Sequence, residues 1–334
     1  MELWSRPIAH PGAWTAAELG GKAGLVRVLT SAELAAIDEL LAQTHNTPAT
    51  DLTAADWTHP ALLTLIGELK DAVMDGRGAM ILSGLDRATH DQAACERVFY
   101  GLGTHLGQAM SQSQRGDRLG YVQSEDDSPT RRGYRSSAEL RWHTDACDIA
   151  ALMCVNRAEE GGFSRLCSLL RVHDAIYEQH PELLPALYEG WHYAIPECAQ
   201  SSRPTTPDKI PVFCAVDGTV SSTFSGTFMR GAAEILGEPL PPALDAGVEE
   251  VYRQAFDPAN HLEFMLEPGE MMYWNNLTVL HARTSFRNAE DTKRLLLRLW
   301  LTVPEGRPVT PGIRHHADNY EWVWREKAKA EGLA

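Results

Sequence analysis

Two residues with metal-binding side chains lie two positions apart in the segment Trp142-His143-Thr144-Asp145. Residues i and i+2 of a β-strand point to the same face, so His143 and Asp145 can chelate one metal ion. An imidazole together with a carboxylate suits divalent iron and related transition metals. The spacing alone is weak evidence, because the sequence contains the pattern His-x-Asp/Glu four times.

The three other copies of this pattern differ in their surroundings. They are His180/Glu182, His261/Glu263 and His316/Asp318. Pro181 makes the first pair the start of a helix, since proline favours the first helical position, and the last pair lies in the C-terminal tail. The pair His261/Glu263 remains an alternative metal site, because it too lies in a predicted strand.

A second group of candidates lies between residues 268 and 301. His281 ends an apolar strand and can complete a set of two histidines and one carboxylate, which leaves three positions open on iron. In the next strand Arg294 and Arg298 point to one face, and leucines point to the other. The remaining residues on the arginine face are Leu296 and Trp300. Buried arginines are costly without anionic partners, and a bound dicarboxylate would supply one.

Together these residues resemble a known family, the Fe(II)/2-oxoglutarate-dependent dioxygenases of the taurine dioxygenase (TauD/TfdA) type, and are nearest to its clavaminate synthase-like members. Four motifs carry the resemblance: WHTD at 142–145, GGFS at 161–164, NNLTVLHART at 275–284 and Arg-x-x-x-Arg at 294–298. They occur in the order that the family has.

The resemblance implies that His143, Asp145 and His281 form the catalytic centre as the three ligands of Fe(II). It implies 2-oxoglutarate as cosubstrate, chelating the metal, and dioxygen as oxidant. Because Asp145 fills the position that a halide needs in related halogenases, halogenation is disfavoured. Hydroxylation with release of succinate and carbon dioxide is the expected reaction, although desaturation, epoxidation and ring closure share its first half.

Three further roles follow from the same resemblance. Arg294 is expected to bind the distal carboxylate of 2-oxoglutarate, since a planar guanidinium grips a carboxylate through two parallel hydrogen bonds. Ser164, where the family usually has Thr, is expected to donate its hydroxyl to the same carboxylate; an ordinary turn hydroxyl is the alternative. Arg298 is expected to face the organic substrate, which suggests a small, carboxylate-bearing or amino-acid-like molecule.

Each of several other side chains near these motifs allows either a functional or a purely structural interpretation. Glu139 and Tyr134 precede the metal-binding segment and could contact substrate, as could Arg230, although a solvated surface arginine is the simpler interpretation. Asn276 is typical of a turn, and its alternative is a supporting role beside the metal.

Two functions from other classes remain open. One is a non-catalytic jelly-roll protein that binds or senses a metal or a dicarboxylate. The other is a non-oxidative metal-dependent enzyme, such as a hydrolase, which would use a zinc-bound water.

The elements that must position these residues indicate a mainly β protein with flanking helices, an α+β fold built on a double-stranded β-helix (jelly roll). Strands are predicted at 76–85, 119–123, 210–216, 219–224, 261–266, 270–274, 277–281 and 294–303. Helices are predicted at 31–44, 60–74, 92–106, 169–179, 181–189, 244–255 and 320–334.

We expect residues 1–334 to form a single enlarged domain. Within it, an N-terminal helical layer occupies about 1–75 and a helical insertion about 174–260. The polar segment 110–141 is long enough to be a functional lid over the site.

Composition narrows the range of partners. The chain carries 30 Lys+Arg against 45 Asp+Glu, a net charge of −15 without a basic run, which excludes the basic surface that nucleic acids or anionic membranes require. The N-terminus lacks the pattern of a signal peptide, so we expect a cytoplasmic protein with free cysteines. Its partner is then a small-molecule substrate, and the sequence leaves a homo-oligomer open.

Overall fold

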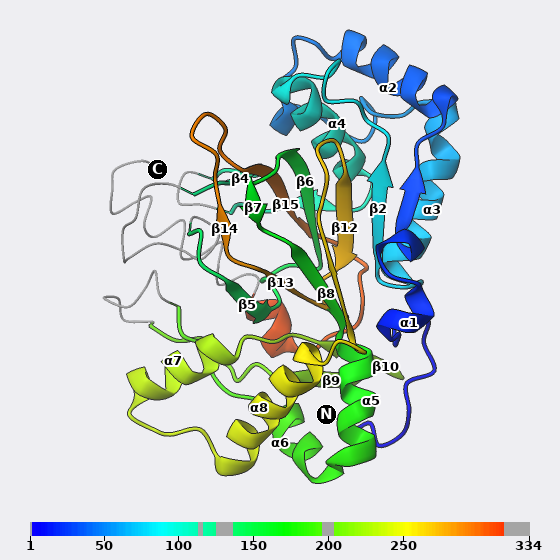
Figure 1. Cartoon of the computed structure of the whole chain (residues 1–334). Coiled ribbons are helices and arrows are strands. Elements are labelled where there is room, and N and C mark those ends of the chain that lie inside the picture. The colour runs from blue at the N-terminus through cyan, green and yellow to red at the C-terminus, as the bar shows by residue number, and fades with distance from the viewer. Residues whose placement is uncertain (1, 113–115, 125–135, 196–203, 317–334) are drawn as a thin grey trace.

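Two β-sheets that lie face to face form the centre of the molecule (Figure 1). A computed structural model describes residues 2–112, 116–124, 136–195 and 204–316. In this part of the chain, the large sheet contains β1 (Val26–Val28), β2 (Ala79–Ser83), β12 (Met271–Asn275), β6 (Ile149–Asn156), β15 (Leu295–Thr302) and β3 (Gln108–Ala109) in that order, with β4 (Gly120–Val122) also paired to β15. The small sheet has the order β11 (His261–Phe264), β8 (Ser164–Ser168), β13 (Val279–Arg283) and β5 (Leu140–His143).

An apolar core joins the two sheets. Ile81, Met272 and Trp300 of the large sheet pack in one buried cluster with Leu166 and Val279 of the small sheet. Except for the parallel pair β1 and β2, the strand pairs of both sheets are antiparallel, which suits a sandwich whose inner faces bury alternate residues. The predicted α+β jelly roll is confirmed.

Helices cover the outer face of the large sheet. The large sheet is covered by α2 (Ser31–Gln43), α3 (Leu63–Met74) and α4 (Gln92–Thr104), whose leucines pack against β6, β12 and β15. A short α1 (Ala16–Leu19) precedes them. Capping boxes at Thr15 and Thr30 begin α1 and α2, because each threonine and the glutamate three residues later satisfy each other's backbone N–H groups.

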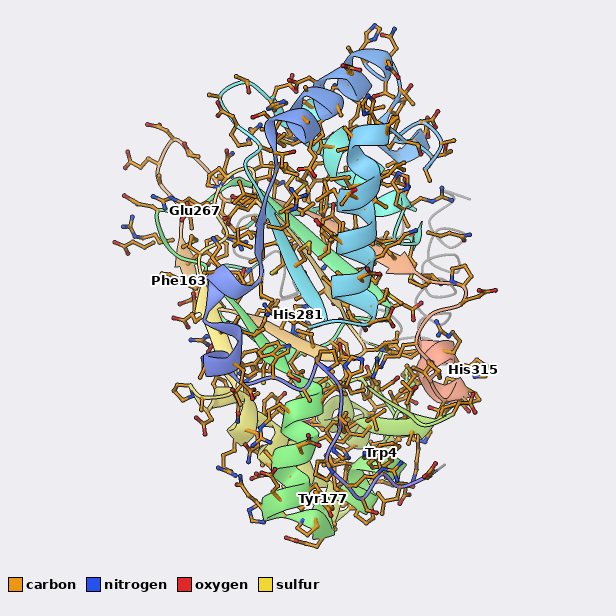
Figure 2. The ribbon with its side chains drawn as sticks, turned by 90° about the vertical axis from the view of Figure 1, so that its right-hand side faces the viewer. Trp4, Phe163, Tyr177, Glu267, His281 and His315 are labelled. Carbon is orange, nitrogen blue, oxygen red and sulfur yellow. The ribbon has the colours of Figure 1, made fainter. Side chains whose placement is uncertain are left out.

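The chain between β8 and β11 packs at one end of the small sheet (Figure 1). It contains α5 (Leu169–Gln179), α6 (Leu184–Glu189), α7 (Gly226–Leu236), α8 (Pro242–Phe256) and a hairpin of β9 (Phe213–Val216) and β10 (Thr219–Ser222). These elements share a buried cluster with Trp142 and Leu280 of the small sheet. Figure 2 shows α5 below the strand that carries His281. A further short pair, β7 (Glu160–Gly161) and β14 (Phe286–Arg287), lies beside the small sheet.

Most predicted elements are confirmed within a few residues, but several strands and two helices were not predicted. The strands are β1, β3, β6, β7, β8 and β14, and the helices are α1 and α7. The helix predicted at 320–334 lies outside the described residues, as do residues 113–115 and 125–135 of the lid candidate. No helix of the described ranges is long and apolar enough to cross a membrane. The cysteines found there are buried and unpaired, at positions 95, 147, 154, 167 and 214.

Candidate active site

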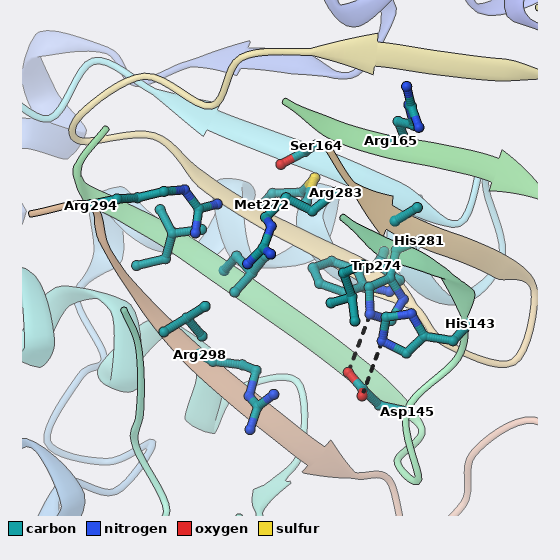
Figure 3. A pocket seen from close by; sticks show the side chains of 15 residues that line it. His143, Asp145, Ser164, Arg165, Met272, Trp274, His281, Arg283, Arg294 and Arg298 are labelled. Carbon is teal, nitrogen blue, oxygen red and sulfur yellow. Dashed lines mark ion pairs between the residues drawn. The ribbon is translucent and has the colours of Figure 1, made fainter. Parts of the chain in front are cut away.

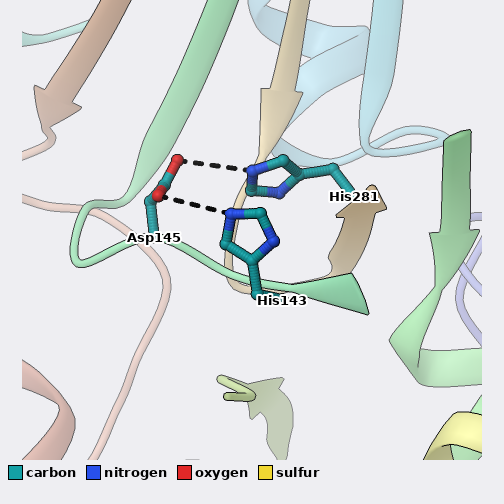
Figure 4. A group of neighbouring side chains, drawn as sticks. All are labelled: His143, Asp145 and His281. Carbon is teal, nitrogen blue, oxygen red and sulfur yellow. Dashed lines mark ion pairs between the residues drawn. The ribbon is translucent and has the colours of Figure 1, made fainter. Parts of the chain in front are cut away.

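Three metal-binding side chains converge where β5 and β13 pair (Figure 4). His143 is the last residue of β5 and lies directly opposite His281 of β13, while Asp145 follows in the loop that leads to β6. The Nε2 atom of His281 lies 3.4 Å from Oδ2 of Asp145, and Nε2 of His143 lies 3.8 Å from Oδ1. All three ligand atoms lie within 4.8 Å of one another. This is the donor set of a non-haem iron site with open positions.

Burial and mutual charge prepare these groups for a metal. Burial lowers the pKa of His143 to about 4, helped by the neighbouring His281, so the imidazole is neutral and free to ligate at neutral pH. Burial disfavours ionisation of Asp145, but a hydrogen bond with His281 and the charges of His143, His281 and Arg298 together hold the pKa of its carboxyl well below the usual range. A divalent cation binds a neutral imidazole and an ionised carboxylate, and these are the states that the surroundings favour for His143 and Asp145.

Hydrogen bonds around the triad fix its orientation. Nδ1 of His143 contacts the carbonyl oxygen of Arg141 at 2.7 Å, which leaves Nε2 to face Asp145. The Asn276 side chain accepts from the Asp145 N–H at 3.0 Å and donates to the carbonyls of Asp145 at 2.6 Å and Cys147 at 2.9 Å. The indole Nε1 of Trp300 donates to Oδ2 of Asp145 at 2.9 Å. Both the backbone and the side chain of Asp145 are therefore held.

A pocket extends from the triad between the two sheets (Figure 3). Its charged and polar lining consists of His143, Asp145, His281, Ser164, Arg165, Arg283, Arg294 and Arg298, and its apolar lining includes Val122, Leu140, Leu152, Met272, Trp274 and Leu296. Asp145 is the one acidic group among these lining residues, against four arginines. Arg165 is paired with Glu139 and Glu263, so the remaining positive charge beside the three metal-binding side chains comes from Arg283, Arg294 and Arg298.

Arg294 lies at the end of the pocket away from the triad (Figure 3). Its side chain is 3% exposed, its Nη1 has no hydrogen-bond partner among the described residues, and its guanidinium lies 5.0 Å from the centre of the Phe286 ring. Burial lowers its pKa to about 10, so it remains a cation at neutral pH. An unsatisfied buried cation is costly, and the distal carboxylate of 2-oxoglutarate fits this position. Ser164 of β8 is buried and lines the same pocket.

Arg283, which was not predicted as a site residue, is the second cation at the end of the pocket that contains Arg294. It is 6% exposed and donates to the carbonyl oxygens of Ser136, at 2.8 Å, and Ala138. Burial and the nearby Arg294 lower its pKa to about 9. The signal in the sequence was its position two residues after His281 in one strand, which places both side chains on the same face.

Arg298 lies nearer the triad and is held by two neighbours. Its Nε donates to Oε1 of Gln112 at 2.6 Å, and Gln112 donates back to the Arg298 carbonyl at 3.0 Å. The guanidinium also lies 4.5 Å from the centre of the Trp300 ring. The alternation of residues in the strand predicted that Arg298 and Trp300 share one face. It did not predict the contact with Gln112, because that contact joins residues nearly two hundred positions apart in the chain.

The alternative metal pair lies outside this centre. Glu263 forms an ion pair with Arg165 at 2.6 Å, and His261 contacts the carbonyl of Asp257. Among the described residues, the only group of three or more such side chains with converging ligand atoms is the triad. Asp318, a member of another copy of the pattern, lies outside the described residues.

The other substrate-contact candidates also have structural partners. Arg230 pairs with Asp245 at 3.0 Å near the surface, as the simpler interpretation expected. Glu139 pairs with Arg165 at 2.8 Å. Tyr134 lies outside the described residues.

Comparison with known proteins gives the same family that the motifs suggested. Residues 41–300 match the family described as taurine catabolism dioxygenase TauD, TfdA family. The FR-33289 synthase of Streptomyces rubellomurinus is 27% identical over 350 residues, which cover 99% of each chain. The taurine hydroxylase-like protein SAT17 of Stachybotrys chartarum is 27% identical over 345 residues, which cover 93% of this chain and 86% of that protein.

Solved structures share the fold. Asparagine oxygenase in complex with Fe(II), 2S,3S-3-hydroxyasparagine and succinate has a TM-score of 0.68 and 19% identity, covering 83% of this chain and 93% of that one. The non-haem iron oxygenase OrfP in complex with Fe and alpha-ketoglutaric acid has a TM-score of 0.60 and 16% identity, covering 83% and 94%.

Proposed function

This chain belongs to the TauD, TfdA family of dioxygenases, and from that premise we propose that it uses Fe(II), 2-oxoglutarate and dioxygen to hydroxylate a C–H bond of a small, carboxylate-bearing, amino-acid-like substrate. The observation that carries the proposal is the pocket itself, which combines a two-histidine, one-carboxylate group with a buried arginine whose Nη1 has no hydrogen-bond partner among the described residues. Neither a zinc hydrolase nor a simple metal-binding protein requires that arginine.

Each pocket residue has a defined task under this proposal. His143, Asp145 and His281 hold the iron, and Arg294 with Ser164 receives the distal carboxylate of 2-oxoglutarate. When bound, iron and 2-oxoglutarate supply the oxidation, which releases succinate and carbon dioxide. The apolar walls, among them Leu152, Met272 and Leu296, exclude water from the reacting centre.

Arg298 supplies the substrate part of the proposal. Its guanidinium lines the pocket on the same face of β15 as Arg294 but closer to Asp145, so an anionic substrate held there lies beside the metal. Relatives of the same fold support an amino-acid-like substrate: one solved structure contains 3-hydroxyasparagine with succinate, and another contains (3S)-hydroxy-L-Arg with succinate. A carboxylate gripped by a guanidinium fixes the C–H bond that is exposed to oxidation.

An anaerobic titration tests the cofactor requirement. Metal-free protein receives Fe(II) and then 2-oxoglutarate, and we expect a weak visible charge-transfer band that requires both. The Arg294→Ala variant should need about tenfold to a hundredfold more 2-oxoglutarate, since hydrogen bonds to a charged group contribute roughly 1.5–3 kcal/mol. A folded protein that never develops the band contradicts the proposal.

Succinate release in air then tests the substrate class. We expect amino acids and their carboxylate-bearing derivatives to stimulate succinate formation above the rate without substrate, and the Arg298→Leu variant to lose that stimulation while it keeps the band. Stimulation by neutral molecules alone would refute an anionic substrate.

A further inference from the structure

Trp300 differs from the other tryptophans of the described residues in what its indole N–H contacts. Five of them bury this N–H without a hydrogen-bond partner in the described part of the chain: Trp4, Trp57, Trp142, Trp191 and Trp274. Trp14 donates to the backbone carbonyl of Arg77. Trp300 alone of this set donates to a carboxylate, and that carboxylate belongs to Asp145.

Core packing explains why an aromatic ring lies at position 300, but it does not explain why the ring directs its N–H toward Asp145. The ring is 4% exposed and belongs to the apolar cluster between the sheets, where a phenylalanine or leucine would also exclude water. Within the described residues, this fold tolerates buried indole N–H groups that have no hydrogen-bond partner. The contact with Oδ2 of Asp145 at 2.9 Å is therefore a specific feature of the site.

Contacts on the ring face hold the indole in place. The Arg298 guanidinium lies 4.5 Å from the centre of the Trp300 ring, a cation–π arrangement, and Gln112 fixes Arg298 in turn through Nε. A cation on the face of an indole withdraws electron density and makes its N–H a stronger donor. The contacts thus run from Gln112 through Arg298 and Trp300 to Asp145.

We infer that Trp300 is a positioning residue for the metal centre: its N–H engages one oxygen of Asp145, so that the carboxylate presents the other oxygen to the metal as a monodentate ligand. The inference rests on the proposed function, because it takes His143, Asp145 and His281 as the ligand set. Hydrogen-bond partners of this kind orient metal ligands, and their loss typically weakens metal binding about 10–100-fold.

The test measures Co(II) affinity and the Co(II) d–d absorption spectrum of the metal-free full-length protein. Trp300→Phe removes the donor and keeps an aromatic ring, and we expect at least about tenfold weaker Co(II) binding together with an altered d–d spectrum. The matched control is Trp57→Phe, which alters a fully buried tryptophan outside the pocket whose N–H has no partner in the described structure. The control should bind Co(II) within about threefold of the original protein and keep its spectrum.

Incorporation of benzothienylalanine at position 300 separates the donor from the ring. Sulfur replaces the N–H in an almost unchanged ring, so this variant decides the question if Trp300→Phe does not fold. It should reproduce the loss of affinity and the altered spectrum.

Failure of this inference and failure of the proposed function give different results. If Co(II) affinity and spectrum are unchanged in the Trp300 variants, or if Trp57→Phe changes them equally, the positioning role is wrong while the proposed function stands. If the unaltered protein binds neither Co(II) nor Fe(II) with 2-oxoglutarate, the proposed function fails first.

Discussion

Individual residues in this pocket are arranged for ligands at the expense of stability. The clearest case is Arg294, whose guanidinium is 3% exposed with Nη1 lacking a partner among the described residues. Its lowered pKa, about 10, shows that the surroundings disfavour the charged form. Under the proposed function, the distal carboxylate of 2-oxoglutarate would offset this cost by pairing with the guanidinium.

This leads to a prediction in which stability and binding change in opposite directions. Arg294→Met should raise the free energy of unfolding of the metal-free protein by about 1–3 kcal/mol, because it removes an unsatisfied buried cation. The same variant should lose most of its affinity for 2-oxoglutarate. Urea denaturation and the anaerobic titration measure the two effects, and a destabilised variant would show that Arg294 is a structural residue.

Replacing one histidine at a time distinguishes the two metal sites that the sequence left open. His143→Ala should abolish detectable Fe(II) binding, because it leaves two of the three ligands. His261→Ala should keep metal affinity within about threefold of the unaltered protein, since this side chain lies in another part of the small sheet. Calorimetric titration with Co(II), used in place of Fe(II), measures the metal affinity of both variants. The reverse pattern would move the metal site to His261 and Glu263.

At the scale of elements, the loop between β5 and β6 determines how the site is assembled. It carries Asp145, and the fully buried Asn276 holds it through three hydrogen bonds to backbone groups of Asp145 and Cys147. Asp148 ends this loop in an ion pair with Arg314 at 2.9 Å. Side chains from the turn before β13, namely Asn276, and from the segment after β15, namely Arg314, thus fix the position of Asp145.

Asn276→Ala should therefore destabilise the protein by about 2–4 kcal/mol, because it leaves several buried backbone groups without partners. It should also weaken Co(II) binding. The matched control is Asn275→Ala, since the neighbouring amide, also buried, accepts one hydrogen bond, from the Leu277 N–H, and its loss should cost about 1 kcal/mol. Urea denaturation of the metal-free variants measures the difference. Equal losses of stability would mean that the cavity left by the side chain, and not the loss of the hydrogen bonds from Asn276 to the loop, causes the destabilisation.

Strands were predicted where turn residues flank an apolar run, as at β2 and β12, or where one face carries polar residues. β15 was predicted because two arginines alternate with leucines, whereas β6 was missed because it is buried on both faces. Its residues alternate between the core of the sandwich, as Ala150 does, and the core under the N-terminal helices, as Met153 does. Both faces are therefore apolar, which removes the period of two on which strand prediction depends.

The same limit applies to the site. Spacing gave four His-x-Asp/Glu pairs without choosing among them, and the resemblance to a known family singled out His143, Asp145 and His281. The contacts of Gln112 with Arg298 and of Trp300 with Asp145 join residues far apart in the chain. Such hydrogen bonds exist only once the sheets have formed, so a single sequence contains no spacing that predicts them.

For the whole molecule, charge is distributed unequally. The chain has a net charge of −15, yet the pocket is lined by four arginines and one acidic residue. A cationic pocket in an acidic protein attracts small anions locally without creating a surface that binds nucleic acid. The arginine-rich lining of the pocket thus contrasts with the acidic balance of the whole chain.

The rise in Tm on ligand binding tests whether the pocket of the intact protein binds a metal and an anion. A ligand at a hundred times its Kd stabilises the folded state by about 2.7 kcal/mol, so Co(II) should raise Tm by roughly 5 °C. 2-Oxoglutarate should add a similar rise when the metal is present. Arg294→Met should keep the rise due to the metal and lose the rise due to 2-oxoglutarate, because only the second ligand contacts the guanidinium. A metal-dependent hydrolase would show the first rise without the second, so scanning calorimetry with each ligand alone and with both distinguishes these functions before any organic substrate is known.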